Sequence, residues 1–329
     1  MERRRPCTVS CRRAPGSRRD KRMRAGLFGL VLAAMVAVVA AAPALAVVRV
    51  VATTTDMAAL VAAVGGDLVS VETLIPPATD PEAFEPRPGD LDRVRHANLL
   101  VRVGLGYDFW LDPLIHRVGD KRLMRGGTAY LDASAGVPLL EIRGQSVVSE
   151  GGHAHGVANP HYWLDPENAA IVTAGIVEAL ARFAPAERDR FVANRERFLA
   201  QLDARLQRWR ESLAPFAGVK FIAYHNSWPY FARRFRLDVI DFVEPRPGVA
   251  PSPAHLAHLI AQGRKAQVRA IVHEPYEPDD QSRLLAEKLG VPFVRLATSV
   301  GSLPHTEDYF ALFEFNAAML ARVLGTPRQ

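Results

Sequence analysis

The feature that most constrains the fold is a long stretch without any strand-like run, residues 166–213, between two regions where strands and helices alternate. The strand candidates are short and almost continuously apolar, as is typical of parallel strands buried on both faces. They are VVRVVATT (47–54), VSVETLI (69–75), NLLVRVG (98–104), VKFIAYH (219–225), LDVIDFV (237–243), VRAIVHE (268–274) and VPFVRLA (291–297). Helical patterns fall between them, at 56–64, 88–97, 108–117, 252–266, 279–289 and 306–324. This alternation predicts parallel sheets covered by helices.

The strand-free stretch itself has the pattern of two helices. Pro185 separates a helix at 167–183 from a longer one at about 186–213, whose apolar residues recur at helical spacing. Three strand candidates precede the stretch and four follow it. We therefore expect an α/β protein of two lobes, each a mostly parallel sheet flanked by helices, joined by one long rigid helix. The expected boundaries are an N-terminal lobe at 47–185, a linking helix at 186–214 and a C-terminal lobe at 215–329.

A basic and apolar segment precedes the first strand candidate. The sequence RMRAGLFGLVLAAMVAVVAAAPALA starts with arginines, continues through an apolar run at 25–42 and ends in Ala-Leu-Ala at 44–46. These are the three parts of a secretory signal peptide. We therefore expect residues 1–46 to be a signal peptide that is cleaved after Ala46 on export to the periplasm. Met23 is an alternative start of the chain.

An uncleaved membrane anchor is the alternative, because the apolar run is long enough for one. Pro43 and the Ala-Leu-Ala ending favour cleavage. Cys7 and Cys11 are the only cysteines, and both precede the apolar run, which excludes a lipoprotein anchor. The exported part would then hold no disulfide and no thiolate metal site. Any metal must be bound there by His, Asp or Glu.

The basic pI of 9.6 also comes from this segment. Residues 1–46 hold ten of the 41 Lys and Arg and only two of the 35 Asp and Glu. Residues 47–329 therefore hold 31 basic and 33 acidic residues, a net charge near −2. This balance gives no indication of a nucleic-acid partner.

Four side chains with metal-binding chemistry lie just outside the predicted helices or at the ends of strands. His225 ends the strand candidate VKFIAYH and Glu274 ends VRAIVHE, so both belong at the C-terminal edge of a parallel sheet. Glu82 lies in the proline-rich turn TDPEAFEPRPGD, and His161 lies in ANPHYWLDP before a helix. Imidazole nitrogens and carboxylate oxygens suit divalent ions such as zinc. In α/β proteins ligands bind at such strand ends, so we expect the four residues to converge between the lobes.

Each of these residues also has an ordinary structural interpretation. His161 beside aromatic residues is typical of a buried structural histidine, and Glu82 could simply cap a turn. Glu274 could pair with an arginine, with His273 facing the cleft in its place. Taken alone, none of the four would justify a metal site; the prediction depends on their convergence.

Other motifs are weaker. His153 and His155 lie in the Gly- and Ser-rich stretch 144–160, and an H-x-H pair there could capture metal as an auxiliary site. Ser227 lies close to His225, but no G-x-S-x-G, Walker A or H-E-x-x-H motif is present. Phe109 stands where a dinucleotide-binding motif would need its third glycine. No enzyme class is indicated.

Five segments together resemble the substrate-binding proteins of zinc and manganese ABC importers, the cluster A-I family of periplasmic binding proteins. They are VVATTTDMAALVAAVGGDLVSVETLIP, DPEAFEPRPGDL, NPHYWLDPENA, YHNSWPYFARRFRL and EPRPGVAPSPAHL, and the resemblance extends over 47–325. It implies two lobes linked by one long helix, with a metal ion held between them and delivered to a membrane permease. The second and third histidine ligands of the family correspond to His161 and His225.

The chain departs from the family pattern at two ligands. The first ligand of the family is usually the His of D-P-H-x-Y-E-P, and here that position is Glu82. The fourth is often an Asp near the segment LATSVGSLPH, which holds Thr298 and Ser299 but no acid. Glu274 is our substitute on geometry alone, with His305 or water as alternatives. Two imidazoles with a carboxylate suit zinc, manganese or iron(II), and the His153/His155 stretch favours zinc.

We therefore expect an exported, monomeric binding protein, without enzymatic activity, that passes a divalent metal ion to an ABC permease in the inner membrane. Zinc is favoured and manganese is second. A periplasmic metallochaperone is a further possible partner. Two other functions are considered: a secreted metal-dependent hydrolase, which needs an open coordination position and a general base such as Glu274, and a binding protein for a chelate such as haem or a siderophore.

Overall fold

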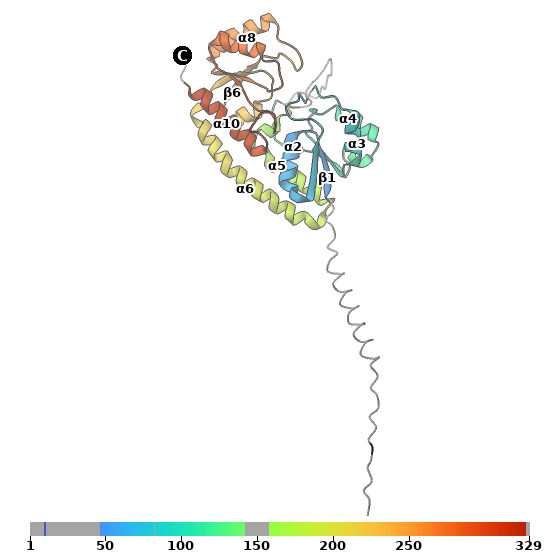
Figure 1. Cartoon of the computed structure of the whole chain (residues 1–329). Helices are drawn as coiled ribbons and strands as arrows, with labels where there is room; N and C mark the ends of the chain where they lie inside the picture. The colour runs from blue at the N-terminus through green and yellow to red at the C-terminus, as the bar shows by residue number, and fades with distance from the viewer. Residues whose placement is uncertain (1–9, 11–46, 82, 142–157, 327–329) are drawn as a thin grey trace, which may run out of the picture. The chain divides into compact units, whose positions relative to one another are not determined.

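The fold was obtained as a computed structural model, which describes residue 10 and residues 47–81, 83–141 and 158–326 (Figure 1). The predicted signal peptide, apart from residue 10, and the candidates Glu82, His153 and His155 lie outside the described residues. Within the described ranges, no helix has both the length and the apolar composition needed to cross a bilayer.

Two parallel four-stranded sheets of the same topology organise the described residues between 47 and 326. The N-terminal sheet has the order β2-β1-β3-β4 and the C-terminal sheet the order β6-β5-β7-β8. The strands are β1 (Val48–Ala52), β2 (Val69–Thr73), β3 (Leu99–Arg102), β4 (Tyr130–Asp132), β5 (Lys220–Ala223), β6 (Asp238–Phe242), β7 (Ala270–His273) and β8 (Phe293–Arg295). The expected α/β fold with two parallel sheets is confirmed.

Helices connect the strands in both halves. In the N-terminal half they are α2 (Thr55–Gly65), α3 (Pro88–His96), α4 (Leu111–Val118) and α5 (Asn168–Ala181). In the C-terminal half they are α7 (Pro229–Phe235), α8 (Pro253–Ala266), α9 (Asp280–Leu289) and α10 (Tyr309–Gly325). Local signals set several starts: the Thr54 side chain accepts a hydrogen bond from the Met57 amide at the start of α2, and Ser252 does the same for His255 before α8.

The sequence prediction missed β4 and α7. The three residues of β4 are too few to show a strand period, so the N-terminal sheet has four strands where three were expected. The seven residues of α7 span only about two turns, too few for a helical repeat to be recognised. Both elements depend on tertiary packing, which short segments need in order to be stable.

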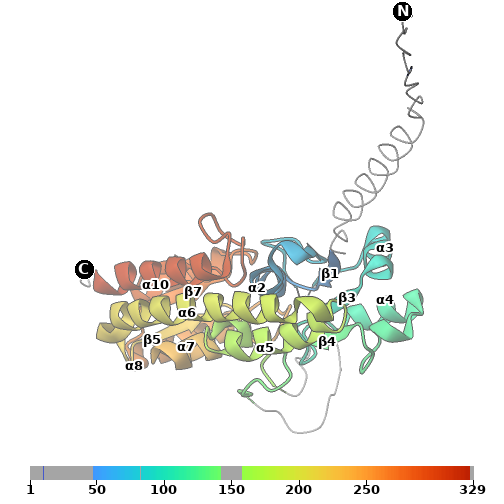
Figure 2. The same ribbon diagram turned by 90° about the horizontal axis from the view of Figure 1, so that it is seen from below.

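The long helix α6 (Arg188–Leu213) lies between the two halves in sequence and packs against α2, α5 and α10. Figure 2 shows it running alongside α5 and α10. The side chains of its apolar stripe are buried as predicted, and Trp209 stacks on Phe313 of α10 with ring centroids 5.3 Å apart. One continuous apolar core contains residues of strands from both sheets, such as Val50 of β1 and Val272 of β7. The helix α6 therefore packs against helices of both halves.

Candidate metal site

His161 lies directly before a 3-10 turn, Tyr162–Leu164, and its side chain is 1% exposed. The ring packs edge-on against Tyr107 and also contacts Trp163, with centroid distances of 5.4 and 5.2 Å. The Oδ1 atom of Asn159 accepts from the His161 amide at 3.0 Å and lies 3.2 Å from its Nδ1. When Nδ1 donates this bond, the lone pair of the neutral ring is on Nε2, the nitrogen that can coordinate a metal.

His225 follows β5 by two residues and is 6% exposed. Its Nδ1 lies 2.6 Å from Oε2 of Glu244, so the same reasoning assigns its lone pair to Nε2. The rings of His225 and His161 contact each other edge to face, with centroids 5.5 Å apart. The fold thus brings together two imidazoles that are 64 residues apart in the sequence.

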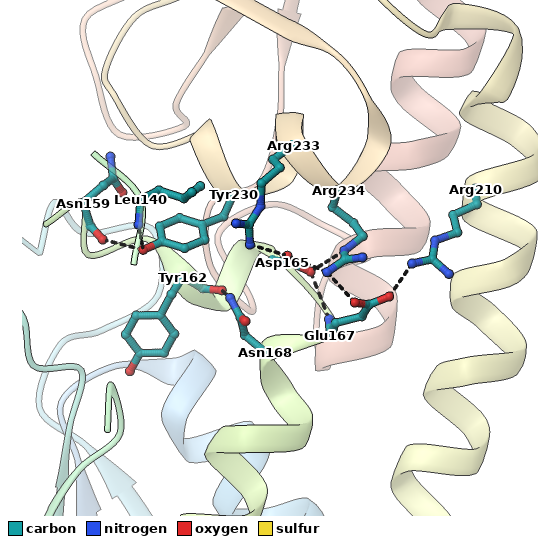
Figure 3. Close-up of polar contacts among 10 residues, drawn as sticks. All are labelled: Leu140, Asn159, Tyr162, Asp165, Glu167, Asn168, Arg210, Tyr230, Arg233 and Arg234. Carbon is teal, nitrogen blue, oxygen red and sulfur yellow. Dashed lines mark hydrogen bonds and ion pairs between the residues drawn. The ribbon is translucent and has the colours of Figure 1, made fainter. Parts of the chain in front are cut away.

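Hydrogen bonds tie the segment of His161 to that of His225. Asn159 donates from Nδ2 to the carbonyl of Asn226, the residue after His225, at 2.9 Å. The hydroxyl of Tyr230 on α7 donates to the carbonyl of Asn159 at 3.0 Å and accepts from the amide of Leu140 at 3.1 Å (Figure 3). These bonds satisfy backbone groups of both segments and so hold the two rings at a set distance.

A second group of contacts anchors the same segment to α7. The carboxylate of Asp165 is fully buried and accepts from Nε and Nη2 of Arg234 at 2.6 and 2.9 Å (Figure 3). Arg233 lies 3.5 Å from the same carboxylate, and Glu167 accepts from Arg234 and from Arg210 of α6. Asp165 and Glu167, four and six residues after His161, therefore fix the chain to both α7 and α6.

Glu274 comes directly after β7, and its side chain is fully buried. One carboxylate oxygen accepts from the His225 amide at 3.2 Å and the other from Nε1 of Trp228 at 2.8 Å. Burial raises the pKa of Glu274 to about 7, while the nearby His225 opposes this rise. The structure thus places this predicted ligand beside His225, where it supports the backbone of that residue.

A cavity of about 40 Å³ lies next to His225 and is lined by acidic residues that the sequence prediction did not single out, namely Asp80, Glu244 and Glu277. Burial raises the pKa of Glu277 to about 7, and the neighbouring Asp80 and Glu244 add to the rise. Ala83 also lines the cavity. Glu244 was detectable in principle, because it follows a strand candidate at the same sheet edge as His225.

Of the predicted ligands that the structure describes, only His225 lines this cavity. His305 is exposed and has a left-handed backbone, with φ of 69°. Thr298, at the family's fourth ligand position, is buried, and its carbonyl accepts from Trp163 Nε1 at 2.9 Å. Among the residues that the structure describes, no three His, Cys, Asp or Glu side chains form a group able to hold a metal ion. The described part of the site is therefore the imidazole pair with its supporting contacts.

Residues 50–323 match the model of a protein family described as zinc-uptake complex component A, periplasmic. The chain belongs to this family. The resemblance inferred from the sequence motifs is thereby confirmed, and with it the membership in a group of binding proteins that serve transport.

Individual relatives agree with this assignment. The chain is 25% identical over 248 residues to the high-affinity zinc uptake system protein ZnuA of Bacillus subtilis. The aligned region covers 74% of this chain and 75% of that protein. It is 23% identical over 286 residues to the metal ABC transporter substrate-binding lipoprotein ScbA of Streptococcus cristatus, covering 84% and 89%. A crystal structure of ZnuA superposes with a TM-score of 0.71 at 26% identity and covers 84% of this chain and 98% of that one.

Proposed function

We propose that the protein captures a divalent metal ion outside the cytoplasm and delivers it to an ABC permease. The observation that carries this proposal is the contact of the His161 and His225 rings at 5.5 Å, each with Nδ1 engaged by an oxygen acceptor. Two neutral imidazoles that present Nε2 from adjacent loops can share one ion without burying an uncompensated charge. Family membership supports the same function.

Glu82 is proposed as the third ligand. Its neighbours Asp80 and Ala83 line the cavity beside His225, which supports a carboxylate at this place. Glu274, His305 or water would complete the coordination shell. Of these we keep Glu274 as the proposed fourth ligand; its carboxylate accepts from the His225 amide and the Trp228 side chain and would have to turn from them toward the ion.

Zinc is the proposed metal and manganese the second candidate. Two imidazoles and one or two carboxylates match the ligands of tetrahedral zinc sites, whereas manganese prefers a larger share of oxygen ligands. The names of the relatives support this preference, since ZnuA of Bacillus subtilis is a zinc uptake protein. The cavity of about 40 Å³ beside His225 also favours an ion over a chelate such as haem, because pockets for organic ligands usually hold several hundred Å³.

The finer assignments are part of the same proposal. Residues 1–46 would be a signal peptide cleaved after Ala46, and the exported monomer would act in the periplasm on a permease of the inner membrane. The lobes would extend over 47–185 and 215–329 around a linking helix at 186–214. His153 and His155 would form an auxiliary capture loop that accepts metal from solution or from a metallochaperone.

The test is a zinc titration of the purified protein against a coloured chelator, with His161→Ala and His225→Ala beside His116→Ala. His116 is exposed on α4 and serves as the control. Loss of either site imidazole should weaken binding by more than the roughly 10–100-fold that is typical for residues outside the coordination shell. Unchanged affinity in both site variants would refute the proposal. Turnover of ester or phosphate substrates by the zinc-loaded protein would favour the hydrolase instead.

A further inference from the structure

We infer that Glu244 is a positioning residue of this site: it holds the His225 imidazole in the orientation and tautomer that direct Nε2 toward the metal ion. This inference rests on the proposed function, and it adds a residue that does not itself contact the ion. It follows from the sheet register, from the contacts of the carboxylate and from the chemistry of imidazole ligands.

An irregularity in the C-terminal sheet sets the position of Glu244. The register between β5 and β6 shifts by one residue, so that Ile222 pairs with Asp241. Continued for three positions, this register places His225 opposite Glu244. Without the shift, His225 would lie opposite the apolar Val243. A bulge of this kind re-aims the side chains that follow it, and here it brings a carboxylate to the imidazole.

Both oxygens of the Glu244 carboxylate are engaged. Oε2 lies 2.6 Å from Nδ1 of His225, and Oε1 accepts from the Gly248 amide at 2.5 Å. Gly248 has φ of 74°, a left-handed conformation that glycine adopts without strain, and Pro245 and Pro247 restrict the loop between them. The side chain of Glu244 is about 5% exposed in this contact. The loop therefore clamps the carboxylate, and the carboxylate in turn restricts rotation of the ring.

This contact has a defined chemical effect on a metal ligand. A carboxylate acceptor keeps the proton of neutral His225 on Nδ1, which leaves the lone pair on Nε2, and it makes that nitrogen a stronger donor. The negative charge also offsets part of the charge of a bound dication. Two other roles are distinct: Glu244 could bind the ion directly, or it could form an ordinary ion pair with a protonated His225.

Nitrogen NMR of the metal-free protein, labelled at histidine, separates these roles. The spectra are recorded at a pH at which an unperturbed histidine side chain is neutral. We expect neutral His225 with its proton on Nδ1 in the natural protein, and a population with the proton on Nε2 in Glu244→Ala. A doubly protonated ring, or a proton on Nε2 in the natural protein, would refute the inference. The spectrum of the natural protein tests the inference by itself, so the test does not depend on whether Glu244→Ala folds.

Zinc titration supplies the second readout. Glu244→Gln should weaken binding by roughly 10–100-fold, whereas Asp241→Asn, an acid-to-amide change three residues earlier on β6, should leave it unchanged. In a His225→Ala background, Glu244→Gln should have no further effect, because the residue acts through the ring. A full additional loss there would indicate direct ligation and overturn the inference. If His225→Ala weakens zinc binding and Glu244→Gln does not, the inference about Glu244 is refuted and the proposed function stands. If His225→Ala has no effect on zinc binding, the proposed function itself is refuted.

Discussion

Replacing Arg234 by methionine tests how strongly the segment of His161 is anchored. The Asp165 carboxylate is fully buried, and Arg234, which is 18% exposed, donates to it through Nε at 2.6 Å and Nη2 at 2.9 Å. Methionine keeps most of the length and apolar volume of the arginine stem but removes its charge. The substitution therefore leaves a buried carboxylate without its main partner.

The cost follows from what remains around Asp165. Removing one partner of a buried ion pair typically costs 3–5 kcal/mol, because the other charge stays buried. Arg233 lies 3.5 Å away and is 44% exposed, and the amide of Glu167 still donates at 3.1 Å, so part of the charge stays compensated. We therefore expect Arg234→Met to lower the free energy of unfolding by about 3 kcal/mol. Asp165→Asn should cost less, about 1–2 kcal/mol, because the arginine it leaves has access to solvent and keeps Glu167 as a partner.

Urea unfolding of the purified protein, followed by tryptophan fluorescence and by circular dichroism, measures these values if both probes agree. Arg188→Met is the matched control, since Arg188 pairs with Glu178 on the surface and should show no measurable change. The reasoning would be refuted if Arg234→Met were no more destabilising than the control, or if Asp165→Asn cost more than Arg234→Met. The double variant should lose less than the sum of the two single ones, because both remove the same contact.

Three further outcomes can be checked. Burial raises the pKa of Asp56 to about 7, so Asp56 binds a proton more readily in the native protein than in the unfolded chain. Its contribution to stability therefore falls as pH rises from about 4 to 7. Urea unfolding across that range should show that Asp56→Asn removes this decline, which amounts to up to about 4 kcal/mol. An unchanged pH profile would contradict this. Tyr230→Phe removes the hydroxyl between Leu140 and Asn159 and should cost about 2 kcal/mol; a neutral effect would show that water replaces it. Zinc affinity should fall in acid as protons compete for His161 and His225, and a flat titration down to about pH 5 would argue against imidazole ligands.

Much of the fold could be predicted from local patterns. The continuous apolar strands, the proline at 185 and the helical spacing along α6 indicate their elements directly, because burial on both faces or along one stripe leaves a periodic trace in the sequence. The elements that were missed, β4 and α7, are short enough to leave no such trace. His161 and His225 were identifiable because each stands at the end or start of an element, within a motif that resembles the family.

The sequence by itself determined the fold class and the family, and it named two histidines as candidate ligands, since each inference depends on residues close together in the chain. Only the tertiary structure decided how the site is supported. It placed the His161 and His225 rings in contact, used both oxygens of Glu274 for the Trp228 side chain and the His225 amide, and set Glu244 against His225. The physical reason is that a shift of one residue between neighbouring strands changes which side chains meet, and this shift arises from the packing of whole sheets.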